Sequence, residues 1–509
     1  MKRTIAFHPI LFAMFPILSI FTFNMGQMPY GERQIAIPLL VSVLSAAAIW
    51  GVLSLILKNS LKAGLITSIL VLLFFSYGHI YSFLIAANIS FTIRYPHLTA
   101  LWMIIIIVSG ALIIRTKRDL KNITTILNIM SITLALLPTA NYLANKAMIS
   151  SAGLKTKTAE QSGENVAAIK SPVEPRDIYY VILDGYSNET TMKEVFNCDI
   201  SDFTSFLKKK GFFVASKSRS NYAFTDLSIP SSLNMKFLDG DMDPLRKKQR
   251  AYLLITARLR TMLEDHKVKD FLKARGYKLI FFSSGFQVDN QNRYFDVPNR
   301  CGRDNEFMYN LLNTTALAPL HGYYVVKKLE NAREKITSCV QDEITKIPEK
   351  GPLFVFAHLD VSHVNMFHEA APSYCGELKA YNKRLETMVS GILSASKKPP
   401  IIVLQGDHGT KTILDEIMGE DGKWDMNKLL ANEPLMDAGL RQRMRIFNAY
   451  YFPAGGEAKL YDSITPVNTF RVMFDYYFGA DFKLMDDRSY FSFPPRNYEF
   501  VDVTERAKF

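Results

Sequence analysis

Five apolar segments in the first 145 residues constrain the fold of this chain more than any other feature. None contains Lys, Arg, Asp or Glu, and each approaches the ~20 residues that a helix needs to cross the hydrocarbon core of a bilayer. The sequence therefore predicts a five-helix transmembrane domain over residues 1–145, with an uncleaved first helix. The segments are Ile5–Met25, Ile35–Leu57, Ala63–Ala87, Leu98–Ile114 and Ile123–Ala144.

The charges of the connecting loops predict the orientation of these helices. With the N-terminus inside, eight Lys and Arg residues lie on the inner side and three on the outer side, as the positive-inside rule requires. Everything after Lys146 then lies outside the cytoplasm. The inner residues are Lys2, Arg3, Lys58, Lys62, Arg115, Lys117, Arg118 and Lys121, and the outer ones are Arg33, Arg94 and Lys146.

The net charge of +12 does not indicate a nucleic-acid partner. The sequence shows no basic run with interleaved aromatic residues and no nucleic-acid motif, and the basic residues flank apolar helices or scatter over the remaining chain.

All four cysteines, Cys198, Cys301, Cys339 and Cys375, lie in the predicted exterior part. Two disulfides with three possible pairings, or four unpaired buried thiols, are both compatible with these positions.

Residues 146–176 are polar and rich in Lys, Ala, Ser and Thr, and we interpret them as a juxtamembrane linker. From Asp177 to Phe509 apolar strands alternate with helical stretches, which predicts a single α/β domain with a mostly parallel central sheet. The candidate strands are Ile178–Leu183, Lys278–Ser283, Leu353–His358, Ile401–Leu404 and Ile446–Phe452. The candidate helices include Asp202–Lys210, Leu259–Arg275, Ala332–Ile347 and Glu377–Ser394.

Three polar residues lie at or just beyond the ends of these strands, where α/β sheets bind their ligands. They are Asp184, His358 and Asp407, and His408 and Gly409 follow Asp407 directly. A carboxylate beside an imidazole suits Zn²⁺ or Mn²⁺ better than Ca²⁺. Taken alone, however, an Asp-His-Gly sequence or a single aspartate is equally compatible with an ordinary turn or helix cap.

The segment Arg219–Asn234 is dense in hydroxyl side chains and contains Thr225. It has the composition of a capped helix start, which needs no catalytic role. The functional interpretation places one hydroxyl on a metal ion, where coordination lowers its pKa and activates it as a nucleophile.

The ordered set of motifs resembles the alkaline phosphatase and sulfatase superfamily. Within it, the chain is similar to the membrane-anchored, sulfatase-like phosphotransferases, which include lipoteichoic acid synthases and lipopolysaccharide phosphoethanolamine transferases. Those proteins have five N-terminal spans and an extracytoplasmic catalytic domain. The motifs are Leu183-Asp184-Gly185, Asn221-Tyr222-Ala223-Phe224-Thr225, His358 with His363, Gly406-Asp407-His408-Gly409, and the tail segments Phe447–Pro453 and Ser463–Arg471.

The resemblance implies an alkaline-phosphatase-like fold and one divalent metal ion, zinc or manganese, held by Asp184, Thr225, Asp407 and His408. Thr225 would be the nucleophile and would carry a phospho-enzyme intermediate. His363 matches the family position of a histidine at the substrate phosphate, and His358 is expected to act there or to position the leaving group. Both histidines are also compatible with a structural role.

Two departures from the wider superfamily narrow the expected reaction. Formylglycine sulfatases carry a cysteine in C-x-P-x-R, whereas no cysteine of this chain has that context and Thr225 occupies the matching position. Two-metal members commonly use Asp-x-x-x-His, whereas Asp360 and His363 are spaced Asp-x-x-His. The sequence therefore favours one metal and disfavours sulfate ester hydrolysis.

We therefore expect an enzyme of the bacterial inner (plasma) membrane, with its catalytic domain periplasmic or extracellular. It would transfer phosphoethanolamine or phosphoglycerol from a phospholipid donor to an envelope glycan or lipid acceptor. Two alternatives remain open from the sequence. One is a phosphodiesterase or sulfatase-type hydrolase of the same fold, and the other is a non-catalytic protein that binds envelope glycans.

Overall fold

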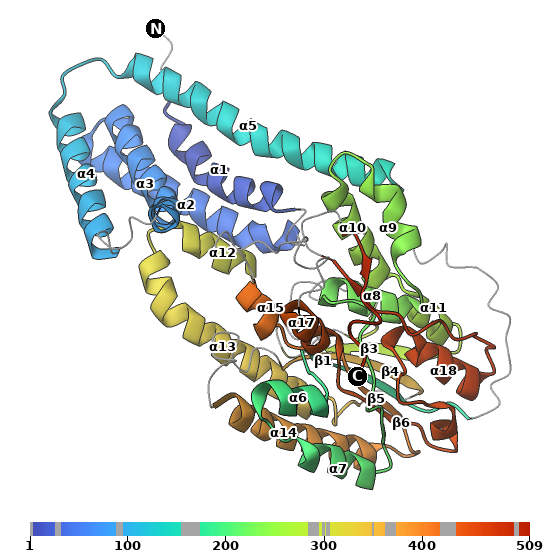
Figure 1. Ribbon diagram of the computed structural model, residues 1–509. Coiled ribbons are helices and arrows are strands. Elements are labelled where there is room, and N and C mark those ends of the chain that lie inside the picture. The colour runs from blue at the N-terminus through green and yellow to red at the C-terminus, as the bar shows by residue number, and fades with distance from the viewer. Residues whose placement is uncertain are drawn as a thin grey trace. The chain divides into compact units, whose positions relative to one another are not determined.

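The structure is a computed structural model that describes residues 4–25, 32–87, 95–153, 174–282, 295–297, 301, 306–348, 351–361, 373–417, 434–492 and 498–509 (Figure 1). The chain divides into two compact units. The first comprises Met1–Ala152 with Asn305–Asn331, and the second comprises Gly153–Asp304 with Ala332–Phe509. The segment Asn305–Asn331 therefore groups with the N-terminal helices, although the sequence pattern assigned it to the domain 177–509.

The first unit is a bundle of apolar helices. The helices α2 to α5 are long and apolar enough to cross a membrane, whereas α1 has 16 residues and is shorter than the predicted first span. Pro9 lies in the first turn of α1, where a missing N–H costs nothing, and the helix begins one residue before it. The bounds are α1 His8–Phe23, α2 Glu32–Leu57, α3 Ser60–Ala86, α4 Tyr95–Arg115, α5 Lys121–Ser151 and α12 Glu306–Thr314.

Polar contacts join the ends of neighbouring helices at both ends of this bundle. At one end the Lys62 ammonium donates to the carbonyl of Ile114 at 2.7 Å, so the loops predicted to face the cytoplasm lie together. At the other end Lys146 lies 2.9 Å from the Glu32 carboxylate. The alternation of the helices thus matches the predicted inner and outer loops.

The second unit is built on a six-stranded mixed sheet with the order β2-β6-β5-β1-β4-β3. The strands β3, β4, β1 and β5 are parallel, β6 is antiparallel to β5, and β2 is antiparallel to β6. This is the mostly parallel sheet that the sequence predicts. The bounds are β1 Ile178–Asp184, β2 Phe213–Val214, β3 Lys278–Phe282, β4 Leu353–Asp360, β5 Ile401–Gly406 and β6 Asn448–Tyr451.

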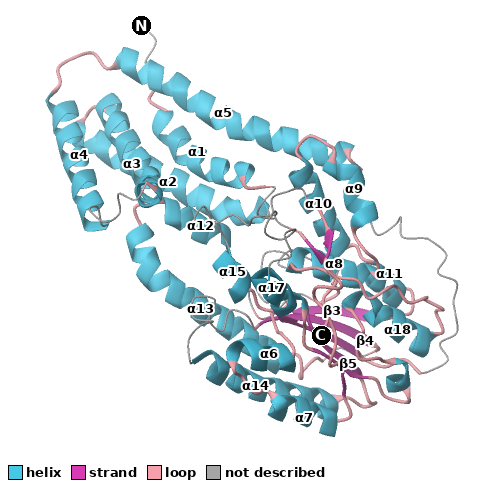
Figure 2. Cartoon of the chain, in the orientation of Figure 1, coloured by secondary structure: helices cyan, strands magenta, loops and turns pink. Residues whose placement is uncertain are grey.

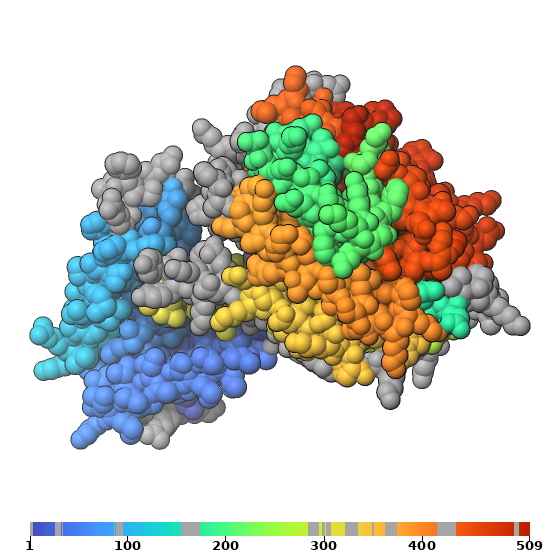
Figure 3. All heavy atoms as spheres, turned by 90° about the horizontal axis from the view of Figure 1, so that it is seen from below, coloured from blue at the N-terminus to red at the C-terminus, as the bar shows by residue number. Residues whose placement is uncertain are grey.

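Helices cover both faces of the sheet (Figure 2). In β1, Val181 points into one core and Tyr180 into the other, so the strand is buried on both sides and reads as a continuous apolar run. The first core is covered by α6 Glu189–Phe196, α7 Ser201–Lys209, the second half of α13 Ala318–Glu343 and α14 Ser373–Ala395 (Figure 3). The second is covered by α8 Thr225–Asn234, α10 Ala251–Glu264, α11 Lys267–Lys273 and α18 Pro466–Phe478.

The predicted helix Leu259–Arg275 is two helices in the structure, α10 and α11. The chain leaves helical geometry at Asp265 and His266, and the His266 side chain accepts the amide of Lys269 as an N-cap. The remaining elements of the described residues are α9 Asp239–Arg246, α15 Thr412–Ile417, α17 Pro434–Met444, the 3-10 helix η3 Gly456–Lys459 and the small antiparallel pair β7 Tyr490–Phe491 and β8 Val501–Asp502.

All four cysteines form disulfides, and the structure selects one of the three pairings. Cys198 pairs with Cys375 and Cys301 pairs with Cys339. Disulfides persist in oxidising compartments, so this pairing agrees with the exterior location that the loop charges predict.

We expect the Cys198–Cys375 disulfide to contribute more stability than the other. It spans 177 residues and Cys301–Cys339 spans 38, so loop-closure entropy gives about 5 and about 4 kcal/mol respectively. Chemical denaturation of the two double alanine variants in detergent measures the difference. Equal denaturation midpoints for both variants and the unchanged protein would contradict a stabilising role.

Candidate metal centre

Three neighbouring strands bring the candidate ligands to one edge of the sheet. The strands β5, β1 and β4 are adjacent and parallel, so their carboxyl ends meet. Asp184 is the last residue of β1, Asp407 follows the last residue of β5, and His358 lies two residues before the end of β4. The register pairs Ile182 with His358, which brings the imidazole close to the end of β1.

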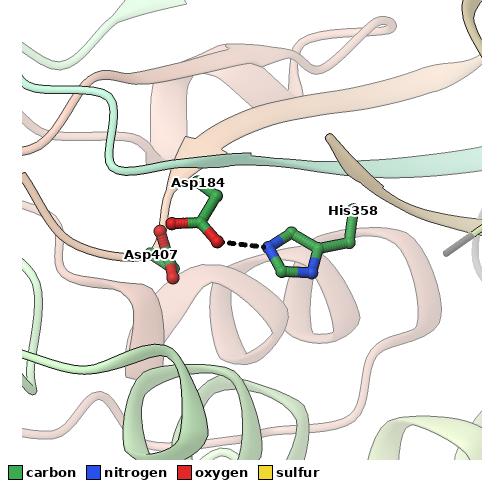
Figure 4. A group of neighbouring side chains, drawn as sticks. All are labelled: Asp184, His358 and Asp407. Carbon is green, nitrogen blue, oxygen red and sulfur yellow. Dashed lines mark ion pairs between the residues drawn. The ribbon is translucent and has the colours of Figure 1, made fainter. Parts of the chain in front are cut away.

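Asp184, His358 and Asp407 form a compact buried cluster (Figure 4). One ligand atom from each residue lies within 4.8 Å of the other two. The Nε2 atom of His358 is 3.2 Å from Oδ2 of Asp184. His358, which we expected to act on the substrate, is therefore also placed to bind a metal. Among the described residues this is the only such group of three His, Cys, Asp or Glu side chains.

His408 and Thr225 adjoin this cluster. The Nε2 atom of His408 lies 3.0 Å from the Thr225 hydroxyl, 3.3 Å from Oδ2 of Asp407 and 3.7 Å from Oδ1 of Asp184. Its Nδ1 atom is 3.1 Å from the carbonyl of Gly409. An Nδ1–H that donates to this carbonyl leaves the Nε2 lone pair facing the carboxylates, as in protein metal sites.

The structure thus brings together five of the six residues singled out from the sequence: Asp184, Thr225, His358, Asp407 and His408. The sixth, His363, lies outside the described residues. Its assignment to the substrate phosphate stays a prediction from the sequence.

Thr225 is the first residue of α8 and is buried. The preceding residue, Phe224, is extended, so the chain turns into the helix at the nucleophile candidate itself. The first turn of a helix presents unpaired N–H groups and a partial positive charge, which favours an anionic oxygen there. A phosphoryl group on the Thr225 hydroxyl would therefore lie at a helix N-terminus.

The electrostatics of the site favour a bound cation. Burial and the neighbouring Asp184 carboxylate raise the pKa of Asp407 to about 7, although His358 and hydrogen bonds from Thr225 and Gly185 oppose this. Burial and the nearby Arg443 lower the pKa of His408 to about 3, so its imidazole is neutral at physiological pH. A cation would favour the ionised carboxylates and accept a lone pair from the neutral imidazole.

The donor set fits a divalent ion. The two carboxylates and the His358 imidazole form a buried cluster, and the His408 imidazole and the Thr225 hydroxyl adjoin it. N and O ligands in this mixture suit Zn²⁺ or Mn²⁺. Ca²⁺ prefers six to eight oxygen ligands, which this cluster does not supply.

Arg443 is a site residue that the sequence analysis missed. Its buried guanidinium donates from Nε to the carbonyl of Ala223 at 2.6 Å and from Nη1 to the carbonyl of Gly409 at 2.8 Å. It therefore ties the turn before Thr225 to the turn that carries His408. Nothing in the sequence distinguishes Arg443 from the neighbouring arginines Arg441 and Arg445.

Gly409 is needed for close packing of this turn. A Cβ atom there would lie 2.1 Å from the carbonyl oxygen of Gln442, and its own amide donates to the carbonyl of Arg443 at 2.7 Å. The glycine of the Asp-His-Gly motif thus lets α17 approach the candidate metal ligands directly.

No protein-family model matches the chain, and no curated protein matches it in sequence. Solved structures do match. The zinc complex of the C-terminal periplasmic domain of EcEptC from Escherichia coli has 13% identity and a TM-score of 0.39, over 66% of this chain and 94% of that chain. The integral membrane lipooligosaccharide phosphoethanolamine transferase A of Neisseria meningitidis has 12% identity and a TM-score of 0.35, over 94% and 96%.

A putative sulfatase, yidJ of Bacteroides fragilis, matches with 10% identity and a TM-score of 0.32, over 63% of this chain and 78% of that chain. Similarity at this level assigns no residue role and no activity to this chain.

Proposed function

We propose that this protein is a metal-dependent phosphotransferase of the bacterial plasma membrane. It would transfer phosphoethanolamine or phosphoglycerol from a phospholipid to an envelope glycan or lipid. The observation that carries the proposal is the position of the Thr225 hydroxyl. It is buried at a helix N-terminus, 3.0 Å from the neutral His408 imidazole, and it hydrogen-bonds the Asp407 carboxylate.

Asp184, His358, Asp407, His408 and the Thr225 oxygen would hold one divalent cation. When bound, it would favour the ionised hydroxyl and offset negative charge on the transferred phosphoryl group. Arg443 keeps the two turns of the site in place through the carbonyls of Ala223 and Gly409.

The reaction would proceed in two displacements at phosphorus. The Thr225 hydroxyl loses its proton, its oxygen attacks the donor phosphorus, and the bond from phosphorus to the diacylglycerol oxygen breaks as that oxygen accepts a proton. In the second displacement the acceptor hydroxyl loses its proton and attacks the phosphorus of the phospho-threonine, and the Thr225 oxygen leaves and is protonated again. We assign the proton donation to His363, from its place in the sequence motif.

An acceptor-dependence assay separates transfer from hydrolysis. We expect diacylglycerol to accumulate from labelled phospholipid in at most a single turnover without acceptor, and continuously with total envelope lipid and glycan. Mass spectrometry of the acceptor fraction then gives the mass of the added group. Continuous release of free phosphoester without acceptor would favour a hydrolase instead.

The proposed orientation can be tested with single cysteines, because all native cysteines are in disulfides. Lys459→Cys lies at an exposed position in the second unit, and Lys117→Cys lies in the loop between α4 and α5. In spheroplasts we expect a membrane-impermeant maleimide to label Lys459→Cys at once and Lys117→Cys only after permeabilisation. The reverse pattern would place the metal centre in the cytoplasm.

A further inference from the structure

The first unit contains an apolar cavity of about 610 Å³, which is within the ~300–1,000 Å³ range of small-molecule sites. The helices α2 and α4 each pack against α3, and residues of all three line the cavity. Ser45 of α2, Phe74 of α3 and Met103 of α4 are examples, and Leu311 of α12 lines it as well.

The cavity spans the middle of the bundle and extends toward its exterior side. Its lining residues run on α2 from Pro38 to Ile49 and on α3 from Leu70 to Tyr77, in both cases across the midpoint of the helix, and on α4 from Thr99 to Ile106, mostly in the N-terminal half. In the orientation predicted from the loop charges, the N-terminal half of α4 is the half nearest the exterior. The cavity therefore reaches from about the middle of the bilayer into the depth of the outer leaflet.

Several polar groups around the cavity already have partners. The Tyr77 hydroxyl contacts the Tyr95 carbonyl at 3.0 Å, the Trp102 indole N–H donates to the Leu73 carbonyl at 2.8 Å, and the Ser42 hydroxyl donates to the Ala13 carbonyl at 2.9 Å. These groups therefore provide little for a head group or a water molecule, and the lining suits hydrocarbon.

The helix α12 supplies the remaining side of this cavity. Phe307 and Leu311 are buried among α1, α2 and α3, and the amide of Ala316 donates to the carbonyl of Phe74 at 2.7 Å. A Cβ atom on Gly78 would lie 1.9 Å from the carbonyl oxygen of Asn313, so only glycine lets the end of α12 approach α3 this closely. The close contact between α12 and α3 therefore depends on Gly78 of α3.

We propose that this cavity binds one acyl chain of a phospholipid in the outer leaflet, and that this lipid is the donor. An empty apolar cavity loses dispersion contacts, and hydrocarbon chains are the neighbours of these helices: Leu44 on α2 and Ile104 on α4 are both 58% exposed. The identity of the lipid as the donor rests on the proposed function, whereas the binding of a chain does not.

The test uses the full chain in nanodiscs that contain a phospholipid with a photoactivatable group in its acyl chain. We expect peptide mapping to place the adducts on lining positions of α2, α4 and α12. Ser45→Phe would fill the cavity and reduce labelling there roughly three- to tenfold, since packing in membranes has modest energies. Ala48→Phe is the matched control, because Ala48 is exposed on the same helix and does not line the cavity.

A kinetic measurement tests the link to the donor. Ser45→Phe should raise the KM for a long-chain phospholipid several-fold, leave kcat nearly unchanged, and leave the turnover of a short-chain soluble donor unaffected. Ala48→Phe should change none of these. Adducts that are equally abundant in all variants would overturn chain binding. An unchanged KM would overturn the assignment of the lipid as donor.

The labelling experiment is repeated with Thr225→Ala, which keeps the two proposals separate. Labelling that persists in this variant supports the cavity even if Thr225 proves not to be the nucleophile. Loss of the specific adducts in Ser45→Phe with an otherwise normal thermal transition excludes misfolding as the cause.

Discussion

Thr225→Ala should abolish transfer, with a fall in kcat of roughly 10⁴-fold or more, because the nucleophile of a covalent mechanism is removed. The hydroxyl is 3.0 Å from His408 and belongs to the first residue of α8, so the substitution removes the oxygen that adjoins the candidate metal ligands. Rate measurements with labelled phospholipid in detergent or nanodiscs provide the readout. Transfer that survives at more than a few per cent would show that another group attacks phosphorus.

Two further variants sharpen this prediction. Thr225→Ser keeps a hydroxyl at the same position, so we expect slower transfer and a phosphoserine adduct when acceptor is withheld. Thr191→Ala removes another buried hydroxyl of the second unit, on α6, and should leave the rate unchanged. Phosphopeptide mapping that finds the adduct on a residue other than 225 would contradict the mechanism directly.

Removal of the metal should destabilise the second unit, and the effect should depend on pH. In the metal-free protein the pKa of Asp407 is raised to about 7, above its ordinary value of about 3.9. The folded state then binds more protons than the unfolded state between these values, so the contribution of Asp407 to stability is fully present below about pH 4. It falls as pH rises, and the loss is complete above about pH 7.

The metal-loaded protein should behave in the opposite way, because a cation competes with protons for the same carboxylates. The shift in Tm on adding Zn²⁺ or Mn²⁺ to chelator-treated protein should therefore grow from pH 5 to pH 8. Asp407→Asn should remove both the Tm shift and the pH slope of the metal-free protein, without a loss of stability in chelator. A slope that persists in this variant would assign the titration to another group.

The strands and the metal-ligand candidates are predictable from the sequence because their signal is local. The runs that became β1, β4 and β5 are continuous and apolar, and each is followed within two residues by a polar side chain. The strands β2, β7 and β8 have only two residues each. They are too short to show the alternation of apolar and polar residues by which a strand is predicted.

The parts that could not be predicted depend on contacts between distant segments. The place of His358 beside Asp184 follows from the register of β1 and β4, which one sequence does not contain. Arg443 donates hydrogen bonds to two backbone carbonyls. Every residue has a backbone carbonyl, so the sequence does not indicate which ones an arginine will contact. The disulfide pairing likewise needed the fold, since the positions of four cysteines leave three possibilities.

The apolar residues of α12 show the same limit. Phe307 and Leu311 are buried on one side of this helix, and the sequence pattern assigned the segment only to the domain 177–509. A stripe of apolar residues indicates burial but not the surface that covers it. The structure places α12 with the membrane helices, although in the chain it lies between β3 and β4 of the other unit.

This insertion means that the protein cannot be divided cleanly at the linker 146–176. A fragment that begins at Asp177 would carry α12 without its partners and would expose Phe307 and Leu311 to water. The base of the insertion is closed by the Cys301–Cys339 disulfide, so residues between these cysteines form a covalently bounded module. During synthesis the N-terminal helices are made first, and this module can pack against them only after β3 has been made.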